Sequence, residues 1–452
     1  MNDLSGLSVE KMTGLNYKCS CGKNHSVEIE NILVGTGVIT QIANVLKSYE
    51  GKKVFIVADV NTYDVAGKKV EELLANRYQV SKYVFKQERL IPNEKALGTL
   101  LVEIPEDTSL IIAVGSGTIN DISRFLSYKI GIPYVIIGTA PSMDGYASVV
   151  SPLVVDGVKT TYNAVYPLAI VADIDIMRQA PMYMLQAGLG DILGKYTALA
   201  DWHIANILND EYFCKEIEKL VLSSLKKCEE AAQSIKDRDD QTVEKIIEAL
   251  ILTGLAIGMV GASRPASGEE HHLSHCYEMI FMNRGETTKW LHGNNVGVGV
   301  GIIAYAYEYL NNIDINKIFR NESYLYLDKA KWRQNIKEVY GTCGSNIIAF
   351  KENSICFNEE ERKINMKKIL ANWESIKKVC EVCVPAPEAI INTLKKAGAI
   401  YSPKELGLDK ELFRKSFIAA KDIRKRYGAL QLLEDLGKLD DVASYITNIY
   451  YN

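Results

Sequence analysis

The order of apolar segments is the feature that most limits how this chain of 452 residues can fold. Between about Lys52 and Ala172, short apolar runs alternate with helical or turn segments, as in an α/β layer. Asp156-Gly157 lies between β-rich arms and predicts a tight hairpin. Further segments follow the same pattern: buried strands at 52–59, 109–115 and 134–141, an amphipathic helix at 68–77, and a last strand within 167–181.

Beyond Pro181 the strand signals almost vanish, and helical periodicity continues to the C-terminus. Pro181 is well placed to start a helix. The apolar stretch 246–262 contains Glu248 and several glycines, which favours a buried core helix over a membrane span. We therefore expect an N-terminal α/β domain (1–177) and an all-helical domain (178–452), with the active site in the cleft between them.

Composition limits the class of ligand. The chain is 47% hydrophobic and 24% charged, as soluble globular proteins are, and its net charge of −4 favours neither nucleic acid nor an anionic membrane as a partner. The N-terminal residues do not resemble a secretory signal. Nine scattered cysteines suit a reducing cytoplasm better than a disulfide framework. A cytoplasmic protein that binds small molecules is the expectation.

Two cysteine patterns have a chemical and a structural interpretation. Cys19, Cys21 and His25 could offer two thiolates and an imidazole to zinc. Their spacing is cramped and no fourth ligand is evident, so a reduced hairpin turn is the favoured interpretation. Cys380 and Cys383 end a helical segment outside any thioredoxin-like context, and a structural role is favoured for them.

A glycine-rich turn follows the predicted strand at 109–115. Gly115 and Gly117 precede Thr118 and Asp121, which open a helix. Glycines let a backbone approach a diphosphate, and a helix N-terminus supplies N–H groups and a positive dipole. The same turn is also a common packing device, so both interpretations stay open.

Asp59 strengthens the nucleotide interpretation because it ends the strand at 52–59, where its carboxylate can accept hydrogen bonds from an adenosine ribose. In the common dinucleotide fingerprint the glycines come first and the acid follows about 20 residues later. Here the acid comes first. The chain therefore has the physical parts of the fingerprint in a different order.

Histidines are concentrated in one segment. His271 and His275 lie four residues apart and would share one helix face, His272 lies between them, and His292 opens a later apolar helix. Asp191 lies in a glycine-flanked apolar segment, where a carboxylate without a partner would be costly. An Asp-His-His set suits a catalytic Lewis-acid metal, and histidines of a helix surface are the alternative.

Five segments together resemble one family. They are GSGTINDISRF, GTAPSMDGYAS, GLGDILGKYTALADW, SRPASGEEHHLSH and LHGNNVGVGVG. They look like sn-glycerol-1-phosphate dehydrogenase of the bacterial branch, within the group of iron-containing alcohol dehydrogenases, glycerol dehydrogenases and dehydroquinate synthases. The matches run in order over roughly residues 50–305 and weaken beyond; the N-terminal C-x-C-G-x-x-H also looks familiar from this branch.

The resemblance implies a dehydroquinate synthase-like architecture, NAD(H) or NADP(H), and one divalent metal per subunit. It places the metal on Asp191, His271 and His292. It assigns the nucleotide to Asp59, Gly115, Ser116, Gly117, Thr118, Asp121, Thr139 and Ser142, with Ser148 and Lys159 near the nicotinamide and Asp144 at the substrate hydroxyl. Relatives often carry an acid after the His-Gly pair, where this chain has Asn294; this departure concerns the charge around the metal, not the ligand.

The implied reaction is the reversible reduction of dihydroxyacetone phosphate, a small-molecule substrate. The metal polarises the carbonyl, and His275 and Asp144 are candidates for the proton relay. Arg264, Ser267 and His272 are our candidates for the substrate phosphate. We expect zinc, with nickel or iron as alternatives, and a homodimer. Glycerol dehydrogenase, a dehydroquinate synthase-like cyclase and a non-catalytic metal or nucleotide sensor are the competing interpretations.

Overall fold

The computed structural model describes residues 4–286, 290–354 and 357–452. The chain divides into two compact units, which are described separately. The N-terminal unit comprises residues 1–192 and 215–263, and the C-terminal unit comprises residues 193–214 and 264–452.

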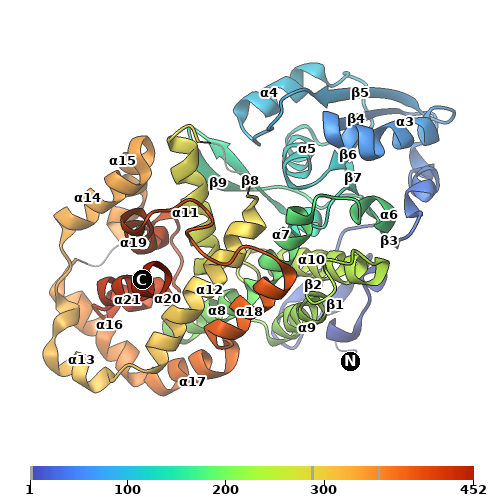
Figure 1. The fold of residues 1–452 in the computed structure, drawn as a ribbon. Coiled ribbons are helices and arrows are strands. Elements are labelled where there is room, and N and C mark those ends of the chain that lie inside the picture. The colour runs from blue at the N-terminus through green and yellow to red at the C-terminus, as the bar shows by residue number, and fades with distance from the viewer. Residues whose placement is uncertain (1–3, 287–289, 355–356) are drawn as a thin grey trace. The chain divides into compact units, whose positions relative to one another are not determined.

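A six-stranded parallel sheet forms the centre of the N-terminal unit (Figure 1). Its strand order is β3-β10-β7-β6-β4-β5. The strands are β3 (Asn31–Gly35), β4 (Lys53–Asp59), β5 (Gln79–Phe85), β6 (Leu110–Gly115), β7 (Tyr134–Gly138) and β10 (Ala169–Asp173). The predicted α/β layer is thereby confirmed.

The four inner strands are the ones that the sequence predicts. Every residue of β6, β7 and β10 is buried, as is most of β4, because the inner strands of a parallel sheet are covered on both faces and read as continuous apolar runs. The prediction missed β3 and β5. Both are edge strands with mostly half-buried residues, so their apolar signal is weaker.

Two antiparallel hairpins accompany the sheet. One pairs β1 (Asn16–Lys18) with β2 (Asn24–Ser26), and the other pairs β8 (Val150–Val155) with β9 (Val158–Asn163). The second turns at Asp156 and Gly157, where φ is 49° and 75°. Positive φ at both central residues is what a tight two-residue hairpin needs, and the predicted turn is confirmed.

Helices complete the N-terminal unit. They are α1 (Ile42–Val45), α2 (Val60–Thr62), α3 (Lys68–Leu74), α4 (Glu94–Glu103), α5 (Gly117–Ile130), α6 (Ile174–Met177), α7 (Met182–Leu193), α9 (Lys215–Ala231) and α10 (Asp240–Val260). As predicted, α10 is a buried core helix. Among the described residues, no helix has the length and apolarity needed to cross a membrane.

The C-terminal unit is helical, and its described residues contain no strand. Its helices are α8 (Lys195–Asn209), α11 (Glu269–Asn283), α12 (His292–Asn311), α13 (Ile315–Asn321), α14 (Lys329–Tyr340), α15 (Gly344–Lys351), α16 (Glu359–Ala371), α17 (Trp373–Cys383), α18 (Pro387–Ala397), α19 (Lys410–Ala419), α20 (Ala429–Asp435) and α21 (Leu439–Tyr451).

The compact units divide the chain differently from the domain boundary placed at 177/178 by the loss of strand signals. Residues 215–263, which form α9 and α10, belong with the sheet. The reason is packing: α9 lies against α10, and α10 packs against the short 3-10 helix η6 (Asp144–Ala147) that follows β7. A boundary placed where the strand signals end cannot predict that later helices pack back against the sheet-containing unit.

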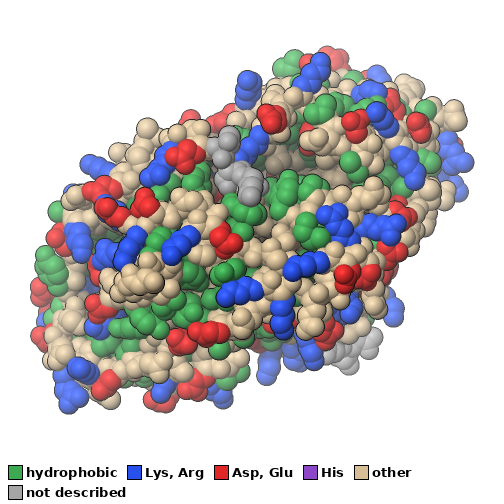
Figure 2. Space-filling model, in the orientation of Figure 1, with side chains coloured by type: hydrophobic (Ala, Val, Ile, Leu, Met, Phe, Trp, Pro, Cys, Tyr) green, Lys and Arg blue, Asp and Glu red, His purple; other side chains and the backbone are tan. Residues whose placement is uncertain are grey.

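Acidic and basic side chains are interspersed over the face shown in Figure 2, with no area of a single sign. This mixture of charges agrees with the small net charge of the chain.

Gly188 of α7 allows a close approach that no other residue permits. A Cβ atom there would lie 2.1 Å from the carbonyl oxygen of Pro141, which is backbone. We predict that Gly188→Ala lowers the free energy of unfolding by about 1–3 kcal/mol, measured by urea denaturation, because the helix must move away from the loop.

The matched control is Gly98→Ala in α4, where an added Cβ meets nothing within 4 Å. Alanine is the better helix former, so this variant should gain up to about 1 kcal/mol. An unchanged stability of Gly188→Ala beside a stabilised Gly98→Ala would contradict the packing argument.

Candidate active site

The reversal of strand order in the parallel sheet identifies a ligand-binding edge. From β4 the chain passes to β5 on one side and then to β6 on the other. Ligands of open parallel sheets bind outside the carboxyl ends of the strands at such a switch point. Asp59 ends β4 and Gly115 ends β6, and Val57 and Ala113, two residues before each, are paired. The carboxylate and the glycine turn therefore end neighbouring strands.

The turn after β6 is built for close approach. A Cβ on Gly115 would lie 2.7 Å from the Cβ of Ile119. Residues 116–118, which include Thr118, are partly exposed between buried flanks. The hydroxyl of Ser116 lies 2.6 Å from that of Ser142, which follows β7. Thr139 N–H donates to the Gly115 carbonyl at 3.2 Å, so the loops after β6 and β7 hold each other in place.

Asp59 has a structural function as well as a charge. Its carboxylate accepts a hydrogen bond from Thr62 N–H at 2.9 Å, and its own N–H donates to the Thr62 hydroxyl at 3.0 Å. This capping box starts α2. Asparagine can also cap a helix but has no charge, so a substitution of Asp59 by asparagine separates the capping function from the charge.

Asp121 lies inside the fold, on α5. It forms an ion pair of 3.3 Å with the fully buried Arg124, which also donates to the Val150 carbonyl and the Tyr134 hydroxyl. Burial raises the pKa of Asp121 to about 7, while the cationic Arg124 and Lys159 oppose this shift. These contacts attach α5 to the β8 hairpin.

Asp191 is fully buried on α7, and one of its contacts lies in the loop after β7. Its Oδ2 accepts a hydrogen bond of 3.0 Å from the backbone N–H of Asp144, the first residue of η6. Ser148 follows η6, and its hydroxyl accepts from Val150 N–H at 3.2 Å. Lys159 lies on β9. The backbone thus orients the Asp191 carboxylate.

Both histidines predicted as metal ligands have Nδ1 fixed by a carboxylate. Nδ1 of His271 lies 2.7 Å from Oε1 of Glu270, and Nδ1 of His292 lies 2.7 Å from Oε1 of Glu278. Ser274 adds a contact of 3.0 Å to His292 Nδ1. The ring centroids of His271 and His292 are 5.1 Å apart, because α11 packs against α12 (Figure 1).

This arrangement is the one that metal-binding imidazoles need. A carboxylate at Nδ1 selects the tautomer with its lone pair on Nε2, and it increases the basicity of the ligand. Burial alone would raise the pKa of Glu270, but the hydrogen bond and the charge of His271 lower it. His271 and His292 each have an imidazole nitrogen, Nε2, suited to a divalent metal.

Asn294 occupies the position after His292-Gly293 where relatives often carry an acidic residue. Its side-chain oxygen accepts a hydrogen bond of 3.0 Å from Leu291 N–H and so helps to start α12. Glu278 supplies a negative charge next to His292 from a different helix.

His275 and His272 have other partners. The Nε2 atom of His275 lies 3.0 Å from Nη2 of Arg424. His272 is buried, with Nδ1 2.6 Å from Glu269, and no hydrogen-bond partner for its Nε2 exists among the described residues. Burial, followed by the charges of Arg424 and Arg426, lowers the pKa of His272 well below its ordinary value. His272 is therefore neutral at physiological pH.

Arg424 and Arg426 form a cationic cluster with Ser267. Arg424 Nη1 lies 3.4 Å from the Ser267 hydroxyl, and Arg426 Nη1 donates to the Ser267 carbonyl at 3.3 Å. Loss of solvation lowers the pKa of Arg424 to about 10, and loss of solvation together with repulsion by Arg424 lowers the pKa of Arg426 to about 9. Cations packed together in this way favour a bound anion.

Arg264 makes contacts different from those of this cluster. Its guanidinium binds both carboxylate oxygens of Glu211, at 2.6 and 2.5 Å, and donates to the Tyr427 carbonyl at 3.0 Å. These bonds hold the segment that carries Arg426.

Sequence reasoning missed four residues of this region. Glu270 and Glu278 lie beside or one turn beyond the histidines that were identified, so carboxylates next to candidate ligands were the available signal. Arg424 and Arg426 lie in a short basic run, Arg-Lys-Arg, and Arg424 is 149 residues from His275. Nothing local connects that run to them.

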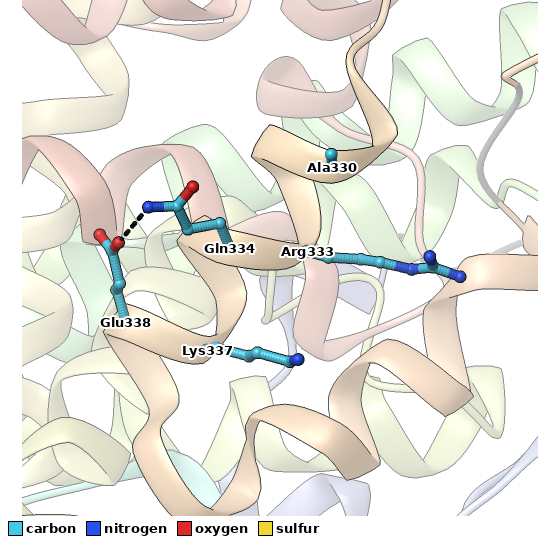
Figure 3. A pocket seen from close by; sticks show the side chains of 5 residues that line it. All are labelled: Ala330, Arg333, Gln334, Lys337 and Glu338. Carbon is cyan, nitrogen blue, oxygen red and sulfur yellow. Dashed lines mark hydrogen bonds between the residues drawn. The ribbon is translucent and has the colours of Figure 1, made fainter.

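The hollow in Figure 3 is lined by none of the candidate site residues described above. Ala330, Arg333, Gln334, Lys337 and Glu338 of α14 line it, and Gln334 donates to Glu338 at 2.7 Å. Arg333 is already paired with Glu352. All five side chains come from one exposed helix face. They include no pair of typical metal ligands and no side chain placed as a nucleophile.

Comparisons with known proteins place the chain among relatives. A family model of iron-containing alcohol dehydrogenases matches residues 33–181. A protein of Halalkalibacterium halodurans is 41% identical over 64% of this chain and 74% of its own length, and one of Geobacillus stearothermophilus is 33% identical over 95% and 98%. Both are named glycerol-1-phosphate dehydrogenase (NAD(P)+).

Solved structures extend the likeness in fold. Glycerol dehydrogenase from Schizosaccharomyces pombe superimposes with a TM-score of 0.59 at 16% identity, covering 92% of this chain and 90% of its own. At this identity the similarity concerns the fold, and it confirms the predicted fold class.

The carboxylate at His292 yields a prediction for metal affinity. Glu278→Gln keeps a hydrogen-bond acceptor but removes the charge, so affinity for a divalent metal should fall roughly 10- to 100-fold. Competition with a chromophoric chelator, using metal-depleted protein, measures the change.

Glu269→Gln is the matched control because the pKa of Glu269 is raised to about 8, by burial first, so that a neutral side chain already suits its position. Its partner is His272, outside the predicted ligand set, and metal affinity should be unchanged. An equal loss of metal affinity in both variants would contradict the role assigned to Glu278.

Proposed function

The chain belongs to the glycerol-1-phosphate dehydrogenase family of iron-containing alcohol dehydrogenases, and we propose that it reduces dihydroxyacetone phosphate reversibly to sn-glycerol 1-phosphate with NAD(P)H. The observation that carries this proposal is the match to a relative of that name over 98% of the relative's length. The buried histidines with carboxylate partners support it chemically.

The metal is proposed to bind Asp191, His271 and His292. When bound, it supplies a Lewis acid for the substrate carbonyl. The chain's own contribution is to orient the ligands: Asp144 N–H directs the Asp191 carboxylate, and Glu270 and Glu278 hold the two imidazoles. Zinc is the proposed metal, with nickel or iron as alternatives, because nitrogen and oxygen donors accept all three.

The nucleotide is proposed to lie across the carboxyl ends of β4, β6 and β7. Backbone N–H groups at the start of α5 would hold the diphosphate, with Ser116, Gly117 and Thr118 at the exposed turn. Asp59 would accept from the adenosine ribose. Asp121 would act through its ion pair with Arg124, by holding α5 in place. The other proposed contacts are Gly115, Thr139, Ser142, Ser148 and Lys159.

The substrate phosphate is proposed to bind Arg424 and Arg426 together with Ser267 and His272. The two guanidinium groups attract an anion, and His272 Nε2 is a buried polar atom to which a phosphate oxygen could form a hydrogen bond. Arg264 then has a positioning role, because Glu211 already engages its guanidinium. A phosphorylated substrate suits this set better than a neutral triol.

Proton transfer is proposed to involve His275 and Asp144. The Arg424 guanidinium can only donate, so Nε2 of His275 accepts this hydrogen bond and the proton of the neutral ring is on Nδ1, from which a relay would begin. Asp144 contributes a carboxylate next to the backbone N–H that orients Asp191. We also propose a cytoplasmic homodimer.

A substrate panel tests the function. NADH oxidation with dihydroxyacetone phosphate should exceed that with dihydroxyacetone by on the order of 100-fold or more in kcat/KM, since only the former offers a dianion. Chelation should abolish the activity and a divalent metal should restore it. The product should not be oxidised by a sn-glycerol-3-phosphate dehydrogenase, which reads the opposite configuration.

Two variants refine this test. Arg426→Met should lower kcat/KM for dihydroxyacetone phosphate about tenfold or more while leaving dihydroxyacetone turnover unchanged. Arg333→Met, on the exposed α14, should change neither. Preference for dihydroxyacetone, or full activity without metal, would refute the proposal.

The double function of Asp59 gives a prediction for cofactor choice. Asp59→Asn keeps a side chain that can cap α2 but removes the charge that repels a 2′-phosphate. The ratio of kcat/KM for NADPH to that for NADH should rise by on the order of tenfold.

Asp59→Ala removes both the cap and the charge and serves as the comparison. It should show the same change in cofactor ratio together with a loss of about 1 kcal/mol in stability. A cofactor ratio that does not change in Asp59→Asn would exclude a ribose role for this carboxylate.

A further inference from the structure

The N-terminal hairpin gathers chemistry that the proposed reaction does not use. Cys19 and Cys21 lie in the turn between β1 and β2, and His25 lies on β2. Gly22 has φ 88°, which bends the chain back after Cys21. The predicted hairpin is confirmed, and its turn holds the two thiols beside the imidazole.

The three ligand atoms lie close together. The two sulfur atoms and a ring nitrogen of His25 are all within 4.8 Å of one another, and Cys21 Sγ lies 3.5 Å from His25 Nε2. Cys21 N–H donates a long hydrogen bond of 3.5 Å to Cys19 Sγ, so the backbone of the turn holds this sulfur in place. Cys19 is 6% exposed and His25 is fully buried, so water competes poorly for these atoms.

His25 is oriented for ligation. Its Nδ1 lies 2.8 Å from the backbone carbonyl of Met259 on α10. A carbonyl oxygen can accept a hydrogen bond but cannot donate one, so Nδ1 carries the N–H. The lone pair is then on Nε2, the atom that faces Cys21. The same tautomer selection operates at His271 and His292, where carboxylates replace the carbonyl.

We propose that Cys19, Cys21 and His25 bind a structural zinc ion, separate from the catalytic metal. Thiolate and imidazole donors select zinc over magnesium, calcium or manganese, and structural zinc sites have four protein ligands. The sequence showed no fourth ligand near the motif. Cys214, a buried cysteine that directly precedes α9 in the chain, is the fourth ligand that we propose to test.

The zinc would attach the hairpin to the core of the N-terminal unit. The hairpin is short, with three residues in each strand, and a hairpin of this size is at best marginally stable alone. The His25 contact reaches Met259, and α10 packs against β2 and α9. The inference does not rest on the proposed function, because a structural zinc would be present whatever reaction is catalysed.

Cobalt replacement separates this site from the catalytic one. The full-length protein is depleted of metal, loaded with Co²⁺ and examined by absorption spectroscopy. A thiolate site gives an intense sulfur-to-cobalt charge-transfer band in the near ultraviolet, whereas a set of one carboxylate and two imidazoles gives none. We expect the band, and zinc analysis of the protein as purified should show a zinc equivalent that mercurial modification of the thiols releases.

Variants identify the ligands. Cys21→Ser and Cys214→Ser should each lose roughly one third of the band, because each removes one of three thiolates. Cys343→Ala, a buried cysteine of the C-terminal unit, is the matched control and should retain the band in full. Circular dichroism confirms that each variant is folded.

The unmutated protein tests whether the site exists, and the variants test its ligands. Absence of the charge-transfer band in the unmutated cobalt protein would overturn the site. A full band in folded Cys21→Ser would overturn the ligand assignment, and a full band in Cys214→Ser would remove Cys214 from it. Dehydrogenase activity is not a readout, so loss of the proposed function would leave these results unaffected.

Discussion

Parallel pairing of β4 with β6 is the constraint on which the N-terminal unit depends. Inner strands of a parallel sheet are covered on both faces, so their backbone groups must pair with each other and their side chains must be apolar. The polar and conformationally special residues then have one place left, the carboxyl ends. Asp59, the glycine turn at Gly115 and the loop at Thr139 follow three neighbouring strands for this reason.

Buried polar groups in the C-terminal unit follow a related rule. Taking imidazoles and carboxylates out of water is costly unless each finds a partner, and the histidines of α11 and α12 do so through Glu269, Glu270 and Glu278. These pairs also select tautomers. The same hydrogen bonds that make burial tolerable therefore decide which nitrogen is available for chemistry.

Two kinds of donor set occur in the chain, and their chemistry distinguishes them. The catalytic set proposed at Asp191, His271 and His292 offers nitrogen and oxygen and suits a metal that must keep a position open for substrate. The set at Cys19, Cys21 and His25 is rich in sulfur and lies on a hairpin that has little stability of its own. A closed structural zinc fits the second and would be useless at the first.

The sequence alone determined whatever depends on a few adjacent residues. The inner strands, the hairpin at Asp156-Gly157, the helix α10 and the fold class could be predicted because backbone preference and apolar periodicity act locally. The predicted ligands and nucleotide contacts came from short motifs through the family resemblance, and their roles remain predictions.

Only the tertiary structure decided what depends on distant partners. Arg424 lies 157 residues from Ser267, β3 pairs with β10 across most of the N-terminal unit, and α9 and α10 return to the sheet after an excursion into the other unit. Glu278 reaches His292 because two helices pack, and His25 finds its carbonyl on α10, 234 residues away. No local pattern encodes such contacts, because they arise from the packing of whole elements, whose energy is shared among many side chains rather than written in any one segment.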